Sequence, residues 1–210
     1  MVRSSDLEML RKHIERKKGE QSLLLSQKKE AEKKKTSLEE YYENTLNARI
    51  VVQLVAEGTQ KHLEYQISSL VSAALASVFP DPYTFELRFV QRRNKTEADM
   101  IFIKNGNETD DILNSGGGGV ADISANISLP FALWSIKKTR PFFLIDEPTK
   151  YLHNPLYQEK ASAMIKEVSK QLRIQILMVS DQDSIIKSAD RVFVCENKKG
   201  VAYVTQKENL

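Results

Sequence analysis

Apolar and polar positions divide the chain into a charged helical arm and a more apolar body. Residues 4–47 contain no proline and only one glycine, Gly19, and charged side chains dominate them. Positions spaced by alternating steps of three and four residues form a line along one helix face, which is the pattern of a coiled-coil seam. This line consists of Leu7, Leu10, Ile14, Lys17, Gln21, Leu24, Lys28, Ala31, Lys35, Leu38 and Tyr42.

The arm has two interpretations, because lysine and glutamine interrupt its seam. It is either a single solvated helix or one strand of an antiparallel coiled coil whose other strand belongs to another segment or chain. Such a polar seam is weak by itself. We therefore expect a coiled-coil arm helix at residues 1–47 and a separate domain at residues 48–210.

The pattern of the body predicts an α/β fold. From residue 48 the helical spacing becomes strongly apolar, until Pro80-Asp81-Pro82 ends the helix. The alternation of Phe85, Leu87 and Phe89 then predicts a strand at residues 84–90. We expect a central sheet with helices and a protruding N-terminal helix. The other expected elements are strands at 99–104, 142–145 and 174–179, a turn at 105–107, helices at 120–138, 156–172 and 184–189, and a closing hairpin of 192–195 with 201–204.

Composition narrows the setting of the protein. The formal net charge of +3 over 210 residues is too small to argue for nucleic acid by itself. The single Cys195 rules out an internal disulfide and suits a reducing cytosol. No apolar run approaches the ~18 residues of a membrane span, and the N-terminus lacks the apolar core of a signal peptide. We therefore expect a cytoplasmic protein without membrane contact.

Two adjacent carboxylates, Asp146 and Glu147, directly follow four apolar residues and precede Pro148. This pattern is typical of a buried parallel strand that ends at a nucleotide site, although a solvated loop is the alternative. Asp146 would hold Mg²⁺, usually through water, and Glu147 would orient or deprotonate the water that attacks a γ-phosphate. No G-x-x-x-x-G-K-[ST] phosphate loop occurs in the 210 residues, so the sequence holds only half of such a site.

A run of glycines, Gly116 to Gly119, follows Ser115 and precedes the helix expected at 120–138. Glycines let the backbone approach a phosphate, their N–H groups form an anion cradle, and a helix start adds partial positive charge. The hydroxyl of Ser115 adds a donor. A flexible linker is the alternative, but a linker would not be expected to run directly into an apolar helix.

Together, these motifs resemble the C-terminal lobe of ABC-type ATPases, which has Ser-Gly-Gly before a helix, then an apolar strand ending in Asp-Glu-Pro, then a second strand. The helical arm narrows the resemblance to the SMC-like branch, and within it to DNA-break-processing ATPases of the SbcC type, including phage versions. RecF, RecN and SMC proteins are relatives. The resemblance covers the whole chain, with the arm as its least specific part.

The resemblance implies a shared active site. In this family an N-terminal lobe carries the phosphate loop, and two heads sandwich two ATP molecules so that the signature of one head caps the γ-phosphate held by the other. ATP and Mg²⁺ are the implied cofactors. A phosphate-loop-bearing lobe, a second head, a nuclease subunit and DNA are the implied partners. Carried onto this chain, the magnesium-linked acid is Asp146, the catalytic base is Glu147, and the signature segment that contacts nucleotide is Ser115, Gly116, Gly117 and Gly118.

Two positions depart from the family pattern. The loop after the acid pair normally ends in Leu-Asp, but here Leu152 precedes His153. The second strand is normally followed by Ser-His, whose histidine contacts the γ-phosphate, but here Ser180 precedes Asp181 and Gln182. An aspartate repels phosphate unless Mg²⁺, a lysine or a proton intervenes, which predicts slow hydrolysis or binding without turnover. Gln182 can act as a neutral contact in its place, or His153 can take over the role, although an exposed loop histidine normally has none.

Basic residues cluster after the first strand, at Arg88, Arg92, Arg93 and Lys95. They suit contacts with a DNA backbone, but an ordinary solvated loop is the favoured interpretation.

Two functions remain open. The first is an ATP-binding and hydrolysing lobe of an SMC-like DNA repair or recombination ATPase, active only when a phosphate-loop-bearing lobe completes it. The second is a non-catalytic regulatory or decoy lobe that binds a full-length ATPase. The missing phosphate loop, Asp181 and His153 favour the second function, whereas the intact Asp146-Glu147 pair favours the first.

Overall fold

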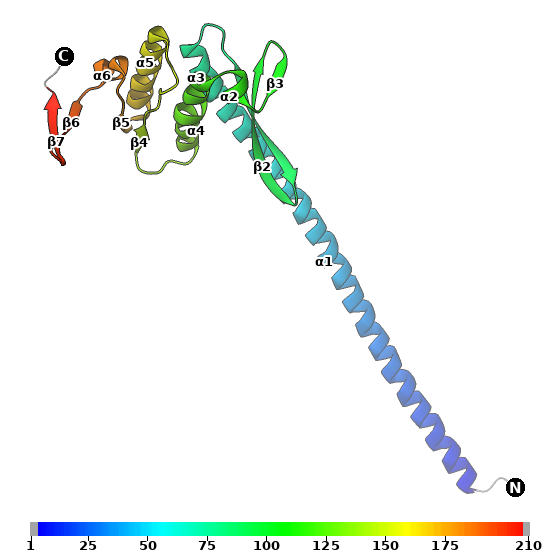
Figure 1. Ribbon diagram of the computed structural model, residues 1–210. Coiled ribbons are helices and arrows are strands. Elements are labelled where there is room, and N and C mark those ends of the chain that lie inside the picture. The colour runs from blue at the N-terminus through cyan, green and yellow to red at the C-terminus, as the bar shows by residue number, and fades with distance from the viewer. Residues whose placement is uncertain (1–3, 208–210) are drawn as a thin grey trace. The chain divides into compact units, whose positions relative to one another are not determined.

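The computed structural model describes residues 4–207, and the chain divides into two units, residues 1–58 and 59–210. Helix α1 (Ser4–Val78) has residues in both units, because no proline interrupts the helical pattern before Pro80 (Figure 1). The helical patterns on either side of residue 47 form one element, as expected of a helix that passes from the arm into the body. The division into units falls after Gly58, further along the chain than the expected boundary.

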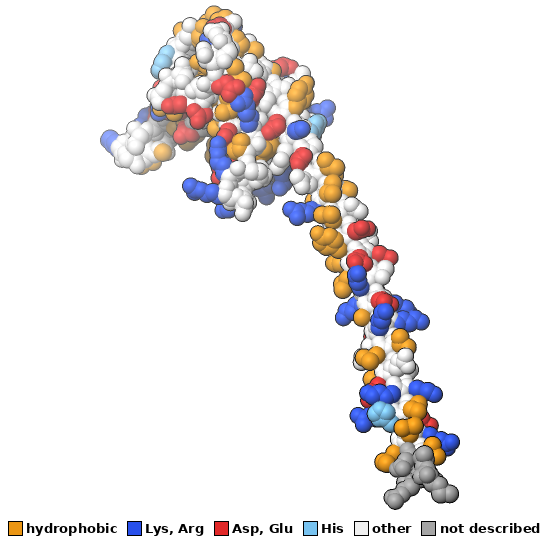
Figure 2. Space-filling view, turned by 90° about the vertical axis from the view of Figure 1, so that its right-hand side faces the viewer, with side chains coloured by type: hydrophobic (Ala, Val, Ile, Leu, Met, Phe, Trp, Pro, Cys, Tyr) orange, Lys and Arg blue, Asp and Glu red, His pale blue; other side chains and the backbone are white. Residues whose placement is uncertain are grey.

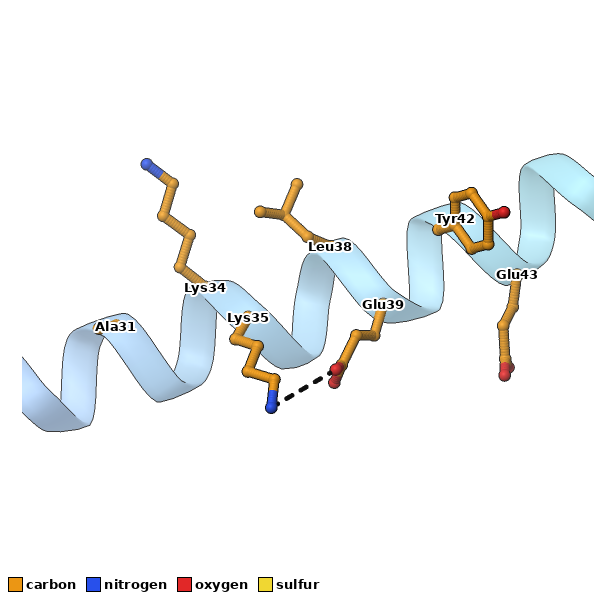
Figure 3. Close-up of a pocket in the computed structure, with 7 residues that line it drawn as sticks. All are labelled: Ala31, Lys34, Lys35, Leu38, Glu39, Tyr42 and Glu43. Carbon is orange, nitrogen blue, oxygen red and sulfur yellow. Dashed lines mark ion pairs between the residues drawn. The ribbon is translucent and has the colours of Figure 1, made fainter.

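In the first unit, α1 exposes apolar and charged side chains along its length (Figure 2). Leu38 and Tyr42 lie one turn apart on one side of the helix (Figure 3). On another side, Lys35 Nζ and Glu39 Oε1 form an ion pair with a distance of 3.7 Å. Ion pairs spaced by four residues support a solvated helix by a few tenths of a kcal/mol each. No described residue covers Leu38 or Tyr42, so the single helix and the coiled-coil strand both remain possible interpretations.

In the second unit, β1 (Thr84–Arg92), β2 (Lys95–Lys104) and β3 (Asn107–Thr109) form an antiparallel sheet in that order. The turn expected at residues 105–107 is present, but β3 was not predicted because three residues are too few to show an alternation. Both connections are two-residue turns of the kind whose twist matches that of hairpin strands. Their residues have positive φ: Arg93 (51°), Asn94 (60°), Asn105 (52°) and Gly106 (78°).

The remaining strands do not join this sheet, so the expected central sheet is divided into three. β4 (Phe142–Asp146) pairs in parallel with β5 (Gln175–Val179), and β6 (Val192–Lys198) pairs antiparallel with β7 (Val201–Lys207). The division arises because no further strand within residues 4–207 pairs with either edge of β4–β5. The α/β class and the long N-terminal helix are as predicted.

The helix expected at residues 120–138 begins at Gly118 and changes its winding. It consists of α3 (Gly118–Ala121), a π-helical segment η1 (Asp122–Ser128) and α4 (Leu129–Ile136). The wider winding lies just before Pro130, whose ring would clash with a carbonyl in a regular helix. The other helices are α2 (Ile112–Ser115), which was not predicted, and α5 (Pro155–Leu172) and α6 (Asp183–Ser188), which were.

One hydrophobic cluster of the second unit joins the end of α1 to β1, β2, η1, α4 and α5. Val71, Phe85 and Ile123 are among its fully buried members. The parallel sheet reaches this cluster with one face only, through residues such as Phe143, whose ring centroid lies 4.9 Å from that of Phe131. The cluster therefore fixes the position of β4, and with it the position of the acids that follow.

Polar side chains of α1 also bind the outer edge of β1. Glu64 Oε1 accepts from the Phe89 N–H at 2.6 Å, Ser68 Oγ accepts from the Leu87 N–H at 2.8 Å, and Ser72 Oγ accepts from the Phe85 N–H at 2.9 Å. Four helical residues rise about 6.0 Å and two strand residues about 6.6–6.8 Å, so the two spacings match closely. This row of three hydrogen bonds, the helix–strand ladder, occupies donors that an edge strand otherwise exposes. The ladder is formed by Glu64, Ser68 and Ser72 with Phe89, Leu87 and Phe85.

Replacing Ser68 by alanine is expected to destabilise the second unit. The substitution leaves the half-buried Leu87 N–H without its acceptor, which costs about 1–3 kcal/mol. Chemical denaturation would measure the change in the free energy of unfolding. Ser69→Ala is the matched control, because the neighbouring Ser69 is exposed and the two substitutions change helix propensity equally. Equal effects of the two variants would show that the ladder contributes no stability.

Candidate functional site

The acid pair lies where β4 ends. Asp146 is the last residue of the strand and is exposed, opposite Val179 of β5. Glu147 turns the chain away with a φ of 43°, and its N–H donates to the carbonyl of Val179 at 2.9 Å. A positive φ at a residue that is not glycine is unfavourable, so this hydrogen bond and the buried Pro148 beside it hold a conformation that local preference disfavours.

Lys150 is the counter-ion of Glu147 in this structure. Its Nζ lies 2.7 Å from Glu147 Oε2, and this hydrogen bond raises the pKa of the lysine, with the charge of the carboxylate adding to it. Both side chains are exposed, so the pair contributes little to stability. The ion pair fixes the position of one oxygen of the Glu147 carboxylate. The position of the other oxygen follows from it, because the carboxylate group is rigid.

Gln182 is hydrogen-bonded to the loop that follows Asp146 and Glu147. Thr149 Oγ1 donates to Gln182 Oε1 at 2.6 Å, and Gln182 Nε2 donates to the Thr149 carbonyl at 2.6 Å. Both ends of the amide therefore have protein partners, and Nε2 keeps a second N–H that can donate to a further acceptor. Asp181 beside it is exposed. The roles of Asp181 and Gln182 toward nucleotide remain predictions.

The signature segment begins inside a short helix. Ser115 ends α2, its hydroxyl lies 3.0 Å from that of Thr109, and its carbonyl accepts from the Tyr83 hydroxyl at 3.1 Å. The N–H groups of Gly116 and Gly117 donate to the Ile112 carbonyl at 2.7 and 3.0 Å. The cradle of open N–H groups expected at these two glycines is therefore already hydrogen-bonded. The first residues of a helix have no acceptor within it, so Gly118 and Gly119, which begin α3, present the donors instead.

The later glycines permit a close contact with the loop behind the acids. A methyl group on Gly118 would lie 2.5 Å from Cβ of Tyr151, and one on Gly119 would lie 3.0 Å from Cδ1 of Leu152. Real Cβ atoms do not approach as closely as 2.5 Å, so Gly118 is needed for packing, whereas a methyl group at Gly119 would require the end of the Leu152 side chain to shift. Gly117 is needed for a different reason, since its φ is 80° and nothing lies near its missing side chain.

A buried carboxylate, Asp122, bridges the same two segments. Its side chain is 1% exposed, Oδ2 accepts from the Tyr151 N–H at 2.7 Å, and Oδ1 accepts from Asn126 Nδ2 at 3.0 Å. Burial raises the pKa of Asp122, while the hydrogen bonds from Tyr151 and Asn126 and the charge of His153 oppose that rise. Sequence reasoning missed this residue, although an acid within an otherwise apolar helical stretch was a usable signal.

His153 is exposed at the end of this loop. A role for His153 toward phosphate remains a prediction.

Two of the four residues in the basic cluster, Arg88 and Arg92, lie on β1 and are paired with acids. Arg88 binds Glu108 and Glu86 at 2.7 and 2.6 Å, and Arg92 binds Asp99 at 2.6 Å. These hydrogen bonds raise the pKa of both guanidinium groups and lower those of Asp99 and Glu108. The surface near this hairpin is therefore mixed in charge, which agrees with the interpretation as an ordinary solvated hairpin.

The outer face of β4–β5 is apolar and exposed. The other face packs against the core, whereas Phe142, Leu144, Leu177 and Val179 are 48%, 70%, 49% and 58% exposed. Parallel sheets are normally covered on both faces. The hairpin β6–β7 is exposed on both faces as well, with large side chains such as Phe193 and Tyr203.

A magnesium site would need groups from elsewhere. No group of three or more His, Cys, Asp or Glu side chains suited to a metal occurs within the part of the chain that the structure describes. Mg²⁺ in nucleotide sites takes one or two carboxylates together with phosphate oxygens and waters, so Asp146 alone fits one position of such a set.

Among residues 4–207, no helix has the length and apolarity needed to cross a membrane.

No family model matches the chain, but comparison with known proteins finds a relative in sequence. The chain is 24% identical over 153 residues to the DNA double-strand break repair Rad50 ATPase of Archaeoglobus fulgidus, which covers 72% of this chain and 16% of that protein. The chain thus spans less than a fifth of the length of this relative.

Solved structures of SMC heads share the fold. The Smc head domain with a coiled coil and joint from Pyrococcus yayanosii superposes with a TM-score of 0.70 at 19% identity, over 97% of this chain and 41% of that one. A structure from a study of ATP-driven dimerization and DNA-stimulated activation of SMC ATPases superposes with a TM-score of 0.54 at 19% identity, over 72% and 89%. The fold is that of an SMC-like ABC-type ATPase lobe with a long N-terminal helix, which confirms the resemblance found in the sequence.

Proposed function

We propose that this chain is the signature-bearing lobe of an SMC-like DNA repair or recombination ATPase, and that a separate phosphate-loop-bearing lobe completes its ATP site. The observation that carries the proposal is the exposed apolar face of β4–β5, which ends at Asp146 and Glu147. Because parallel sheets are normally covered on both faces, a bare apolar face is expected to be covered by a further part of the protein or by a partner. The bare face adjoins the acids, so the covering lobe would bring its phosphate loop beside them.

Each residue of the site has a defined task in this proposal. Mg²⁺, when bound with ATP, neutralises charge on the phosphates. Asp146 would hold the ion, usually through water, and Glu147 would orient the attacking water and accept its proton. Lys150 holds the carboxylate of Glu147 before nucleotide arrives. Gly118 and Gly119, at the start of α3, would offer N–H donors to the nucleotide of a second head.

The proposed partners follow from the comparisons. The likeness to a structure described by ATP-driven dimerization supports a head–head dimer, and the likeness to a DNA double-strand break repair ATPase supports DNA as a partner. A nuclease subunit is a proposal that rests on the resemblance in the sequence alone. In this scheme ATP holds two heads together and hydrolysis releases them.

A second candidate function, a non-catalytic regulatory lobe, is favoured by one observation. Thr149 holds both ends of the Gln182 amide, and Asp181 stands where the family has a histidine, so the end of β5 carries an acid and a fixed amide in place of that histidine. In that case the same apolar face would bind a lobe of a full-length ATPase without supporting turnover.

Mixing experiments distinguish the two functions. ATP hydrolysis is measured for this chain alone and after addition of the candidate phosphate-loop lobe from the same genome, with size-exclusion chromatography alongside. We expect no turnover from the chain alone, and ATP-dependent assembly with hydrolysis after mixing. Tight assembly without hydrolysis would favour the regulatory function, and absence of assembly with any such lobe would contradict both.

A further inference from the structure

Asp122 has features that the proposed chemistry does not use. It is an almost fully buried acid on the helix that follows the signature segment, and burial disfavours its charged form. Such a group is retained only if its hydrogen bonds offset the loss of water. One of its two bonds is local, to Asn126, but the other crosses to the Tyr151 N–H.

The crossing bond is one part of a continuous set of contacts. Gly118 and Gly119 pack against Tyr151 and Leu152, so the start of α3 and the loop at residues 149–153 are in direct contact. At the other end of the loop, Thr149 is bound through its hydroxyl and its carbonyl to Gln182, which follows β5. The loop is thus attached on one side to the signature segment and on the other to the strand that pairs with β4.

We propose that Asp122 is a positioning residue that couples the signature segment to the loop behind Glu147. The inference rests on the proposed function, in which the signature of one head meets the nucleotide held by a second head. Movement of Gly118 and Gly119 toward that nucleotide would be transmitted by Asp122 to the Tyr151 amide, and so to the turn that holds Glu147. Asp122 would thereby make hydrolysis at one site depend on occupancy of the other.

A carboxylate suits this role better than other side chains. It accepts two hydrogen bonds at once, here from groups on two different segments, and a charged acceptor binds an N–H more strongly than a neutral one. An asparagine would keep an acceptor for the Tyr151 N–H, and Asn126 would have to turn its amide to remain paired. A leucine of similar size would keep the volume and remove both acceptors.

Hydrogen exchange in the full chain tests the coupling without any need for catalysis. In Asp122→Leu, we expect the Tyr151 amide to exchange about ten- to a hundredfold faster, as expected for loss of a bond to a charged acceptor. Asp122→Asn should stay within about threefold of the original protein, since one acceptor remains. Ser124→Ala is the matched control: Ser124 is equally buried on the same helix, but its hydroxyl bonds the Val120 carbonyl within the helix.

Gly118→Ala provides a second route if Asp122→Leu does not fold. Its methyl group would push Tyr151 away from α3, so the amides of residues 149–153 should again exchange faster. Unchanged exchange of Tyr151 in both variants would overturn the proposal, whatever the rate of hydrolysis.

The functional measurement uses the chain assembled with its phosphate-loop lobe. We expect hydrolysis to depend cooperatively on ATP in the original protein, and Asp122→Leu to lower the Hill coefficient to about 1, with Ser124→Ala unchanged. A Hill coefficient that Asp122→Leu leaves above 1 would contradict the coupling. Failure of the original protein to hydrolyse ATP with any partner lobe would instead count against the proposed function, while the exchange result would still decide whether Asp122 joins the two segments.

Discussion

Replacing Leu144 by lysine is expected to abolish assembly with a phosphate-loop-bearing lobe while leaving the isolated chain folded. Leu144 is 70% exposed at the centre of β4, on the bare face of the parallel sheet. In the isolated chain its replacement should change the free energy of unfolding by no more than about 0.5 kcal/mol. In the assembled head the lysine would be covered, and an unpaired buried ammonium weakens association by at least about a hundredfold.

The matched control for this substitution is Leu133→Lys. Leu133 is a half-exposed leucine on α4, away from the outer face of β4–β5. Association is measured by titration of the partner lobe, and folding by denaturation of each chain alone. Equal affinity of the Leu144 and Leu133 variants for the partner would show that the apolar face is not the contact surface.

Replacing Glu147 by glutamine should stop turnover but strengthen ATP-dependent association of heads. The amide keeps the shape of the side chain but cannot accept the proton of the attacking water. General-base catalysis contributes about 10²–10⁴-fold, so kcat in the assembled enzyme should fall by at least about a hundredfold. ATP that is bound but not cleaved would keep the heads together, which size-exclusion chromatography with ATP and Mg²⁺ would detect.

Glu159→Gln is the control for the Glu147 variant. It makes the same chemical change at an exposed position on α5, beyond the loop that follows the acids. If Glu147→Gln left both turnover and assembly as they were, the regulatory function would replace the catalytic one.

Much of the fold was predictable because its signals are local. The proline-free helical pattern, the alternation in β1 and the abrupt change from apolar strand to Asp146-Glu147 each lie within a short stretch of sequence. The division of the strands into three sheets was not predictable, because it depends on which other strands are available to pair. A strand pattern shows that a segment is extended, not which neighbour it has.

The candidate site shows the same limit at the level of single residues. The glycine run before a helix predicts a phosphate cradle, but the N–H groups of Gly116 and Gly117 donate to the Ile112 carbonyl instead. The contacts of Gly118 with Tyr151 and of Gln182 with Thr149 join residues far apart in the sequence, so no local pattern indicates them. Asp122 lies between these cases. The sequence shows an acid within an apolar helix, but it does not show that the Tyr151 N–H is its partner.

The helix–strand ladder restricts how the end of α1 can slide along β1. A small displacement would lengthen all three hydrogen bonds together, so the favourable positions are about one helical turn apart. Displacement by one turn in one direction would place Gln60, Glu64 and Ser68 opposite the three N–H groups, and all three side chains can accept. Displacement in the other direction would bring Ala76 opposite Phe85, where there is no acceptor. Sliding is therefore easier in one direction than in the other, which gives this junction a built-in polarity.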